Sequence, residues 1–173
     1  MTEFPCASSK PGLDSGRKKQ RTTLHKNHER RKPTMADGMR YIFKVSDVPL
    51  IQSPDGTMQD SVMITEDTCG SDQYTAGLFW VRPGTHGHSD VHPGQDEVYY
   101  IISGRGILHL EGVEHRMEAG DVVFVPKGHE HSVSNDGDEV LSLFWAIGEG
   151  WSKLPEIRDE LSTWPEIPAD QHW

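Results

Sequence analysis

The sequence is short of cysteine, of long apolar segments and, beyond its first forty residues, of positive charge. Its two cysteines, Cys6 and Cys69, lie in no CxxC motif and provide no disulfide framework. No apolar run approaches the roughly 18 residues of a membrane-spanning helix, and no signal-peptide pattern opens the chain. We therefore expect a reduced, cytoplasmic protein with no membrane partner.

Positive charge is concentrated at the N-terminal end. Residues 1–40 contain ten Lys or Arg and four Asp or Glu, whereas the remainder contains seven and 23. Such an acidic body does not suit phosphate binding, so we expect no nucleic-acid partner. Residues 1–37 are polar and show no apolar period, and they cannot bury enough surface to offset the entropy of ordering. The sequence predicts a disordered basic extension there.

Turn-forming residues are frequent for a chain of this length. The 173 residues suit one domain, and 17 Gly, 11 Pro and a hydrophobic content of 34% favour short strands over long helices. Apolar runs predict strands over residues 41–48, 62–65, 74–82, 98–103, 107–110, 122–125 and 140–147. Turns recur between these runs at roughly 8–12 residues, a spacing typical of an all-β sandwich or barrel.

Histidines and carboxylates gather in residues 84–104. Asp90 and His92 are two apart, so on a strand they would share a face. Pro93-Gly94 is a turn signal, and a hairpin there would return Glu97 opposite His92. Imidazole and carboxylate are ligand types that first-row transition metals bind. The stretch therefore predicts part of a metal site.

A second stretch, residues 120–135, supplies further histidines after a short apolar strand. Gly120, Pro126, Gly128, His131 and Asn135 follow the pattern Gly-x5-Pro-x-Gly-x2-His-x3-Asn. This pattern is the second motif of the cupin superfamily, which the chain therefore resembles. The first motif, Gly-x5-His-x-His-x4-Glu-x6-Gly, is matched at Gly84, His92, Glu97 and Gly104, with Asp90 in place of its first histidine.

The resemblance implies a single double-stranded β-helix, a small jelly-roll barrel, over residues 38–148. Residues 149–173 would then form a short C-terminal helix or an extended tail. Because three tryptophans lie there, we expect this tail to pack on the barrel or on a partner subunit. Family habit also implies a homodimer.

The resemblance places the metal ligands at Asp90, His92, Glu97 and His131. Three arrangements are open at this point. In the first, Asp90 binds the metal. In the second, the Asp90 side chain does not reach the metal, and His92, Glu97 and His131 form a triad similar to that of non-haem Fe(II) oxygenases. Alternatively, His88 or His86 replaces the missing histidine through a bulge. The first two arrangements are favoured over the third.

Two further residues are candidates for catalysis. Tyr99 lies two residues after Glu97, so it is either a general acid or an aromatic wall of the cavity. His109 is either an acid or base facing the cavity or a structural histidine within its strand.

The implied function is that of a metal-dependent enzyme acting on a small organic molecule, with one divalent transition metal per chain. Fe(II) is favoured, followed by manganese, nickel or zinc. The leading expectation is dioxygenase chemistry, in which the substrate's oxygen atoms chelate the metal. One alternative is a non-redox cyclase, isomerase or lyase that acts through an enolate. Another is a non-catalytic cupin that binds a small ligand.

Overall fold

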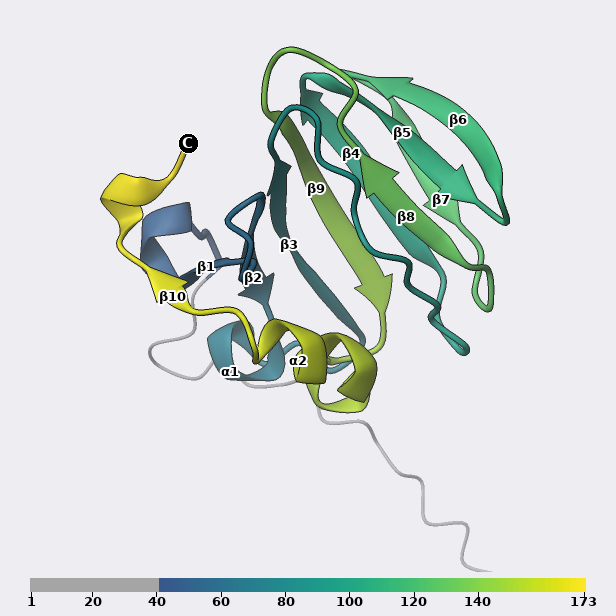
Figure 1. The fold of residues 1–173 in the computed structure, drawn as a ribbon. Helices are drawn as coiled ribbons and strands as arrows, with labels where there is room; N and C mark the ends of the chain where they lie inside the picture. The colour runs from purple at the N-terminus through teal and green to yellow at the C-terminus, as the bar shows by residue number, and fades with distance from the viewer. Residues whose placement is uncertain (1–40) are drawn as a thin grey trace, which may run out of the picture. The chain divides into compact units, whose positions relative to one another are not determined.

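The computed structural model describes residues 41–173, so the predicted disordered extension lies outside the described residues (Figure 1). The described part is built almost entirely of antiparallel strands, which confirms the all-β prediction. In chain order the strands are β1 (Leu50–Gln52), β2 (Met58–Ile64), β3 (Tyr74–Val81), β4 (Glu97–Ser103), β5 (Arg105–Leu110), β6 (Val113–Glu118), β7 (Val122–Val125), β8 (His131–Ser134), β9 (Leu141–Gly148) and β10 (Glu166–Ile167).

Helices in this part of the chain are short. The two α-helices are α1 (Glu66–Cys69) and α2 (Pro155–Leu161), and single 3-10 turns lie at Val45–Asp47, Trp151–Lys153 and Ala169–Gln171. Pro155 occupies the first turn of α2, where its missing N–H costs nothing. Among the described residues, no helix combines the length and the apolar character needed to cross a membrane.

The strands form two sheets that face each other, as in a double-stranded β-helix (Figure 1). The larger sheet has the order β10-β1-β2-β3-β9-β4-β7, and the smaller has the order β6-β5-β8. The core lies between them because alternate side chains of each strand point inward. In β9, for example, Leu143, Trp145 and Ile147 are buried, whereas Phe144 is exposed on the outer face.

The strand predicted over residues 41–48 is wrong. The Asp47 backbone N–H donates a hydrogen bond to the Lys44 carbonyl oxygen at 2.9 Å, which closes a 3-10 turn instead, and the Lys44 N–H donates to Asp47 Oδ2 at 2.9 Å. Ile42 is 84% exposed, so this run has no buried apolar face that would hold it on a sheet. The first strand begins only after Pro49, and it pairs with both β2 and β10.

The 84–92 segment, which joins β3 to the turn before β4, follows β8 without forming a regular strand. Backbone hydrogen bonds connect Gly87 N to Val133 O and Asp90 N to His131 O, at 2.9 and 2.8 Å. A Cβ at Gly87 would lie 2.5 Å from the Val133 carbonyl oxygen, so glycine permits this close approach. Because the segment is irregular, the expectation that Asp90 and His92 share one face of a strand does not hold.

Candidate metal centre

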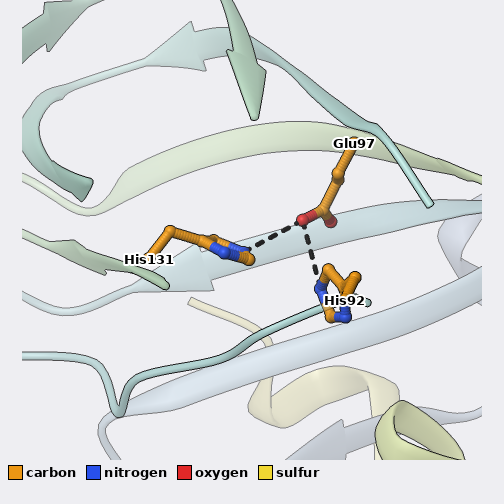
Figure 2. Close-up of side chains that lie close together, drawn as sticks. All are labelled: His92, Glu97 and His131. Carbon is orange, nitrogen blue, oxygen red and sulfur yellow. Dashed lines mark ion pairs between the residues drawn. The ribbon is translucent and has the colours of Figure 1, made fainter. Parts of the chain in front are cut away.

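Three ligand-type side chains from three different elements converge inside the barrel. Glu97 opens β4, His131 opens β8 and His92 ends the 84–92 segment. Glu97 Oε2 lies 3.4 Å from His92 Nε2 and 3.2 Å from His131 Nε2 (Figure 2). One ligand atom from each of the three residues lies within 4.8 Å of the other two. We call His92, Glu97 and His131 the triad.

The triad is buried, and the Tyr99 hydroxyl supports it by donating a hydrogen bond to Glu97 Oε2 at 2.9 Å. Burial raises the pKa of Glu97, but hydrogen bonds from His131 and His92 lower it by more, so the carboxylate stays ionised. Burial and the neighbouring Glu97 charge raise the pKa of Tyr99 well above its usual value. Tyr99 therefore keeps its proton and orients Glu97.

A backbone carbonyl group fixes the orientation of the His131 ring. Its Nδ1 lies 3.1 Å from the His129 carbonyl oxygen, and because a carbonyl only accepts, Nδ1 carries the proton of this bond. A neutral His131 then presents the lone pair of Nε2 to Glu97 Oε2. Two acceptors at this distance need a positive charge between them, which a proton or a metal cation provides.

Metal-ion chemistry fits this donor set. Nitrogen and oxygen ligands bind ions such as zinc at about 2.1 Å, so neighbouring ligand atoms on one ion lie roughly 3–3.5 Å apart. The contacts from Glu97 to the two histidines have this spacing. Burial lowers the pKa of His131, but the Glu97 hydrogen bond and charge raise it by more. The same negative charge that holds a proton there attracts a metal ion.

A cavity of about 100 Å³ adjoins the triad. Strands β2, β3 and β9 provide Met58, Asp60, Phe79 and Trp145 to its wall, and the C-terminal part provides Ile157, Glu160, Leu161 and Trp164. Helix α2 follows β9 at the end of the barrel and so closes one side of the cavity (Figure 1). The mixture of apolar walls and a few polar groups is typical of a small-molecule site.

Asp90 lies apart from the triad, in a second group with His88 and Glu160. His88 Nε2 is 2.5 Å from Glu160 Oε1 and 3.5 Å from Asp90 Oδ2. The Asp90 side chain is 40% exposed. This group connects the 84–92 segment to α2 beside the cavity, and all three residues line it.

The two candidates for catalysis have different surroundings. Tyr99 lines the cavity, as its position after Glu97 suggested. His109 does not, because it points to the side of β5 opposite the buried Leu108 and contacts Ser134 Oγ at 2.5 Å. Among the described residues, no hydrogen bond or ion pair joins His109 to the triad.

Asp60, Trp145 and Glu160 were missed by sequence reasoning although they line the cavity. Asp60 lies 37 residues before Glu97 and Glu160 lies 29 residues after His131, far from either motif. The only available signal was a carboxylate inside the strand-forming run of β2, where a buried charge is costly.

Comparisons with known proteins identify relatives of this chain. A family model described as a cupin domain matches residues 77–147. An oxalate-binding protein of Thermotoga maritima is 37% identical over 65 residues, which are 38% of this chain and 54% of that protein. An acireductone dioxygenase of Bacillus mycoides is 34% identical over 73 residues, 38% of this chain and 40% of that protein. This chain thus spans about half the length of these two relatives or less.

Solved structures show the same fold. A crystal structure of a predicted oxalate decarboxylase from Thermotoga maritima superposes with a TM-score of 0.55 at 24% identity. The match covers 63% of this chain and 99% of that one. At this identity the likeness concerns the fold alone.

Proposed function

Since this chain belongs to the cupin superfamily, we propose that its barrel is a metal-dependent enzyme for a small organic molecule. His92, Glu97 and His131 would hold one divalent transition metal ion. The ion would polarise the substrate's oxygen atoms and leave coordination positions open to them. Asp90 would remain outside the ligand set, with His88 and Glu160.

One observation carries this proposal: two imidazole nitrogens and a tyrosine hydroxyl all meet one buried carboxylate oxygen, Glu97 Oε2. A barrel that needed only stability would fill this place with apolar side chains, because burying ionisable groups is costly. The cost is understandable if the groups bind a cation. Tyr99 then positions Glu97, and the apolar wall of the cavity keeps water away.

Within this class we propose Fe(II)-dependent dioxygenase chemistry. Two histidines and one carboxylate are the ligand set of many non-haem Fe(II) oxygenases. The similarity to an acireductone dioxygenase supports the same choice. The cavity next to the triad is small, about 100 Å³, whereas a cavity of about 150 Å³ holds benzene; a second hollow shares Met58, His88, Asp90, Glu160 and Trp164 with it, so a substrate could extend outward.

The similarity to an oxalate-binding protein favours a second candidate, a cupin that binds a small ligand without transforming it. A non-redox cyclase, isomerase or lyase would use the same triad. These candidates differ in whether oxygen is consumed and whether the ligand is changed.

The test begins with metal content. Purified protein is depleted of metal, supplied in turn with Fe(II), Mn(II), Ni(II) and Zn(II), and analysed beside His131→Ala. His115→Ala is the control, because His115 is exposed on β6. We expect near-stoichiometric metal in the wild type and in His115→Ala, and a loss of affinity of at least 100-fold in His131→Ala.

Oxygen uptake by the Fe(II) form with acireductone, and oxalate binding without turnover, then separate the candidates. Uptake supports the dioxygenase. Binding of oxalate with no uptake and no product supports the non-catalytic candidate. A wild type that takes up none of the four metals would refute both enzyme candidates and leave the non-catalytic one.

A further inference from the structure

Two polar groups that line the cavity lack a well-formed hydrogen bond among the described residues. Asp60 Oδ1 and Trp145 Nε1 are both buried and neither meets the geometry of a hydrogen bond, although the Trp145 indole lies close enough to the Asp60 carboxyl group to lower its pKa. Both residues line the cavity that adjoins the triad. Buried polar groups in proteins are almost always paired, so two orphans that face the same cavity need a ligand to pair with them.

We propose that Asp60 and Trp145 bind the substrate directly and orient it toward the triad. This inference rests on the proposed function, which it extends by naming substrate-contacting residues outside the metal ligands. An indole N–H only donates, so Trp145 requires an acceptor oxygen on the substrate. A carboxyl oxygen accepts, so Asp60 suits a hydroxyl group. The pair therefore fits a small molecule that carries both a hydroxyl and a carbonyl oxygen.

The backbone explains why the two groups come together. Asp60 on β2 lies opposite Phe79 of β3, and Trp145 on β9 lies opposite Gly77, also of β3. A Cβ at Gly77 would lie 2.9 Å from Trp145 Cε2, the ring atom bonded to Nε1. Because Gly77 has no side chain, the indole lies across β3 and brings its N–H toward β2.

The electrostatics of Asp60 agree with a ligand contact. Burial raises the pKa of its carboxyl group well above the usual value, and the nearby Trp145 indole offsets only part of that rise. In either protonation state Oδ1 can accept a hydrogen bond from a hydroxyl group, so the contact does not depend on this shift. A buried carboxyl group with only poorly aligned donors beside it is a cost to folding, and a hydroxyl group of the substrate would offset that cost.

The experiment uses full-length protein loaded with Zn(II) and glycolate as the probe, a small metal ligand whose hydroxyl group keeps its proton and whose carboxylate oxygens accept hydrogen bonds. The chain has five tryptophans, and Trp145→Phe identifies the NMR signal of the Trp145 indole N–H. We expect this signal to move when the probe is added to the wild type. The signal of Trp80, which does not line the cavity, is the internal reference.

Probe affinity measured by calorimetry provides the second readout. We expect Asp60→Ala to bind the probe about tenfold more weakly, as the loss of one hydrogen bond predicts, while its zinc content and melting temperature do not fall. Asp60→Asn, which keeps the shape, should lose less. Met63→Leu is the control on the same strand, because Met63 does not line the cavity, and it should bind the probe like the wild type.

If the wild type binds zinc but its Trp145 signal stays still and both Asp60 variants bind the probe normally, the inference is wrong and the proposed function stands. If the wild type binds neither zinc nor any of the other three metals, the proposed function fails and the inference with it. If Asp60→Ala loses stability and zinc together while Asp60→Asn behaves as wild type, Asp60 is structural and the inference is again wrong.

Discussion

At the scale of single residues, one oxygen atom has an unusual number of neighbours. Glu97 Oε2 accepts a hydrogen bond from the Tyr99 hydroxyl and also faces the two triad histidines. The groups that surround a ligand set its orientation and basicity, and their loss typically costs 10–100-fold in metal affinity. Tyr99 is therefore expected to matter although it binds no metal.

We predict that Tyr99→Phe lowers metal affinity by about tenfold with little change in fold, because only a hydroxyl group is removed. Competition with a chromophoric chelator measures the affinity. The control is Tyr100→Phe, one residue along β4 on the outer face and 47% exposed. Equal affinities for the two variants would show that the Tyr99 bond to Glu97 is not needed for metal binding.

The residues of the triad could be selected from the sequence because they stand at fixed positions of the two motifs, although only Glu97 and His131 lie on strands. Asp90 could not be placed in the same way. Its position depends on two backbone hydrogen bonds with His131, which fix an irregular segment that the sequence does not predict. The role of Asp60 could not be predicted either, because the sequence of β2 does not indicate that Trp145 of β9 lies on the other side of β3.

At the scale of elements, the 84–92 segment determines where His92 lies. Its backbone joins β8 at Gly84, Gly87 and Asp90, and the Asn135 N–H returns a bond to Thr85 O at 2.9 Å. Asn135 also holds the loops around it, since its side-chain amide donates to Val81 O and Glu139 O, both at 2.8 Å. The last position of the second motif thus supports the site without touching it.

We predict that Gly87→Ala destabilises the protein by about 1–3 kcal/mol, the usual cost of overpacking, and weakens metal binding by shifting His92. Its new methyl group would meet the Val133 carbonyl oxygen, which as backbone cannot move aside. Chemical denaturation and chelator competition measure the two effects. Gly94→Ala is the control, since a Cβ there meets nothing within 4 Å; a loss of stability equal to that of Gly87→Ala would refute the steric explanation.

The contact between His88 and Glu160 ties α2 to the 84–92 segment. The Glu160 hydrogen bond raises the pKa of His88, burial opposes the rise, and the charges of Asp90, Glu160 and Asp55 add to it. A histidine whose pKa is higher in the folded protein contributes stability below its unfolded pKa of about 6.5. That contribution disappears as the pH rises through the folded value.

We therefore predict that Glu160→Gln lowers the free energy of unfolding near pH 5.5 and has little effect near pH 9. The difference should stay below about 1 kcal/mol because the pair is partly exposed. Denaturation of the wild type and variant at both pH values measures it. A difference that is the same at both values would mean that the charge on His88 contributes nothing.

At the scale of the whole molecule, the larger sheet has an apolar outer face. Six large side chains are exposed on its last three strands: Val98, Tyr100, Ile102, Val122, Phe124 and Phe144. The strand registers place Tyr100 between Val122 and Phe144, so the face is continuous. Edge strand β7 pairs only with β4 among the described strands. An uncharged face of this kind is typical of an interface, and we propose a second copy of the chain as its partner.

We predict a homodimer in sedimentation, and a monomer for Phe124→Glu. Val113→Glu is the matched control, because Val113 on the smaller sheet is exposed to the same extent, 56%. A carboxylate in the centre of the interface would lose its hydration on association, whereas one on β6 would not. If both variants sediment as the wild type does, this sheet face is not the interface.

The barrel as a whole was predictable because turn residues and apolar alternation repeat along the chain. Within each strand, the alternation indicates which side chains face the core. The C-terminal part was less predictable. Its short helix follows from Pro155 and the residues after it, but the contribution of Ile157, Glu160 and Trp164 to the cavity depends on the path after β9. The pairing of β10 with β1 joins residues more than one hundred positions apart, which no local pattern encodes.

The backbone bonds between the 84–92 segment and β8 have a consequence for evolution. Main-chain groups hold this segment in place, so the side chains at His88 and Asp90 can be exchanged without moving His92. Both side chains line the cavity, so substitutions that change the cavity are separated from substitutions in the triad. A descendant of this protein could acquire a new substrate by changing residues 88 and 90, while its metal centre is inherited unchanged.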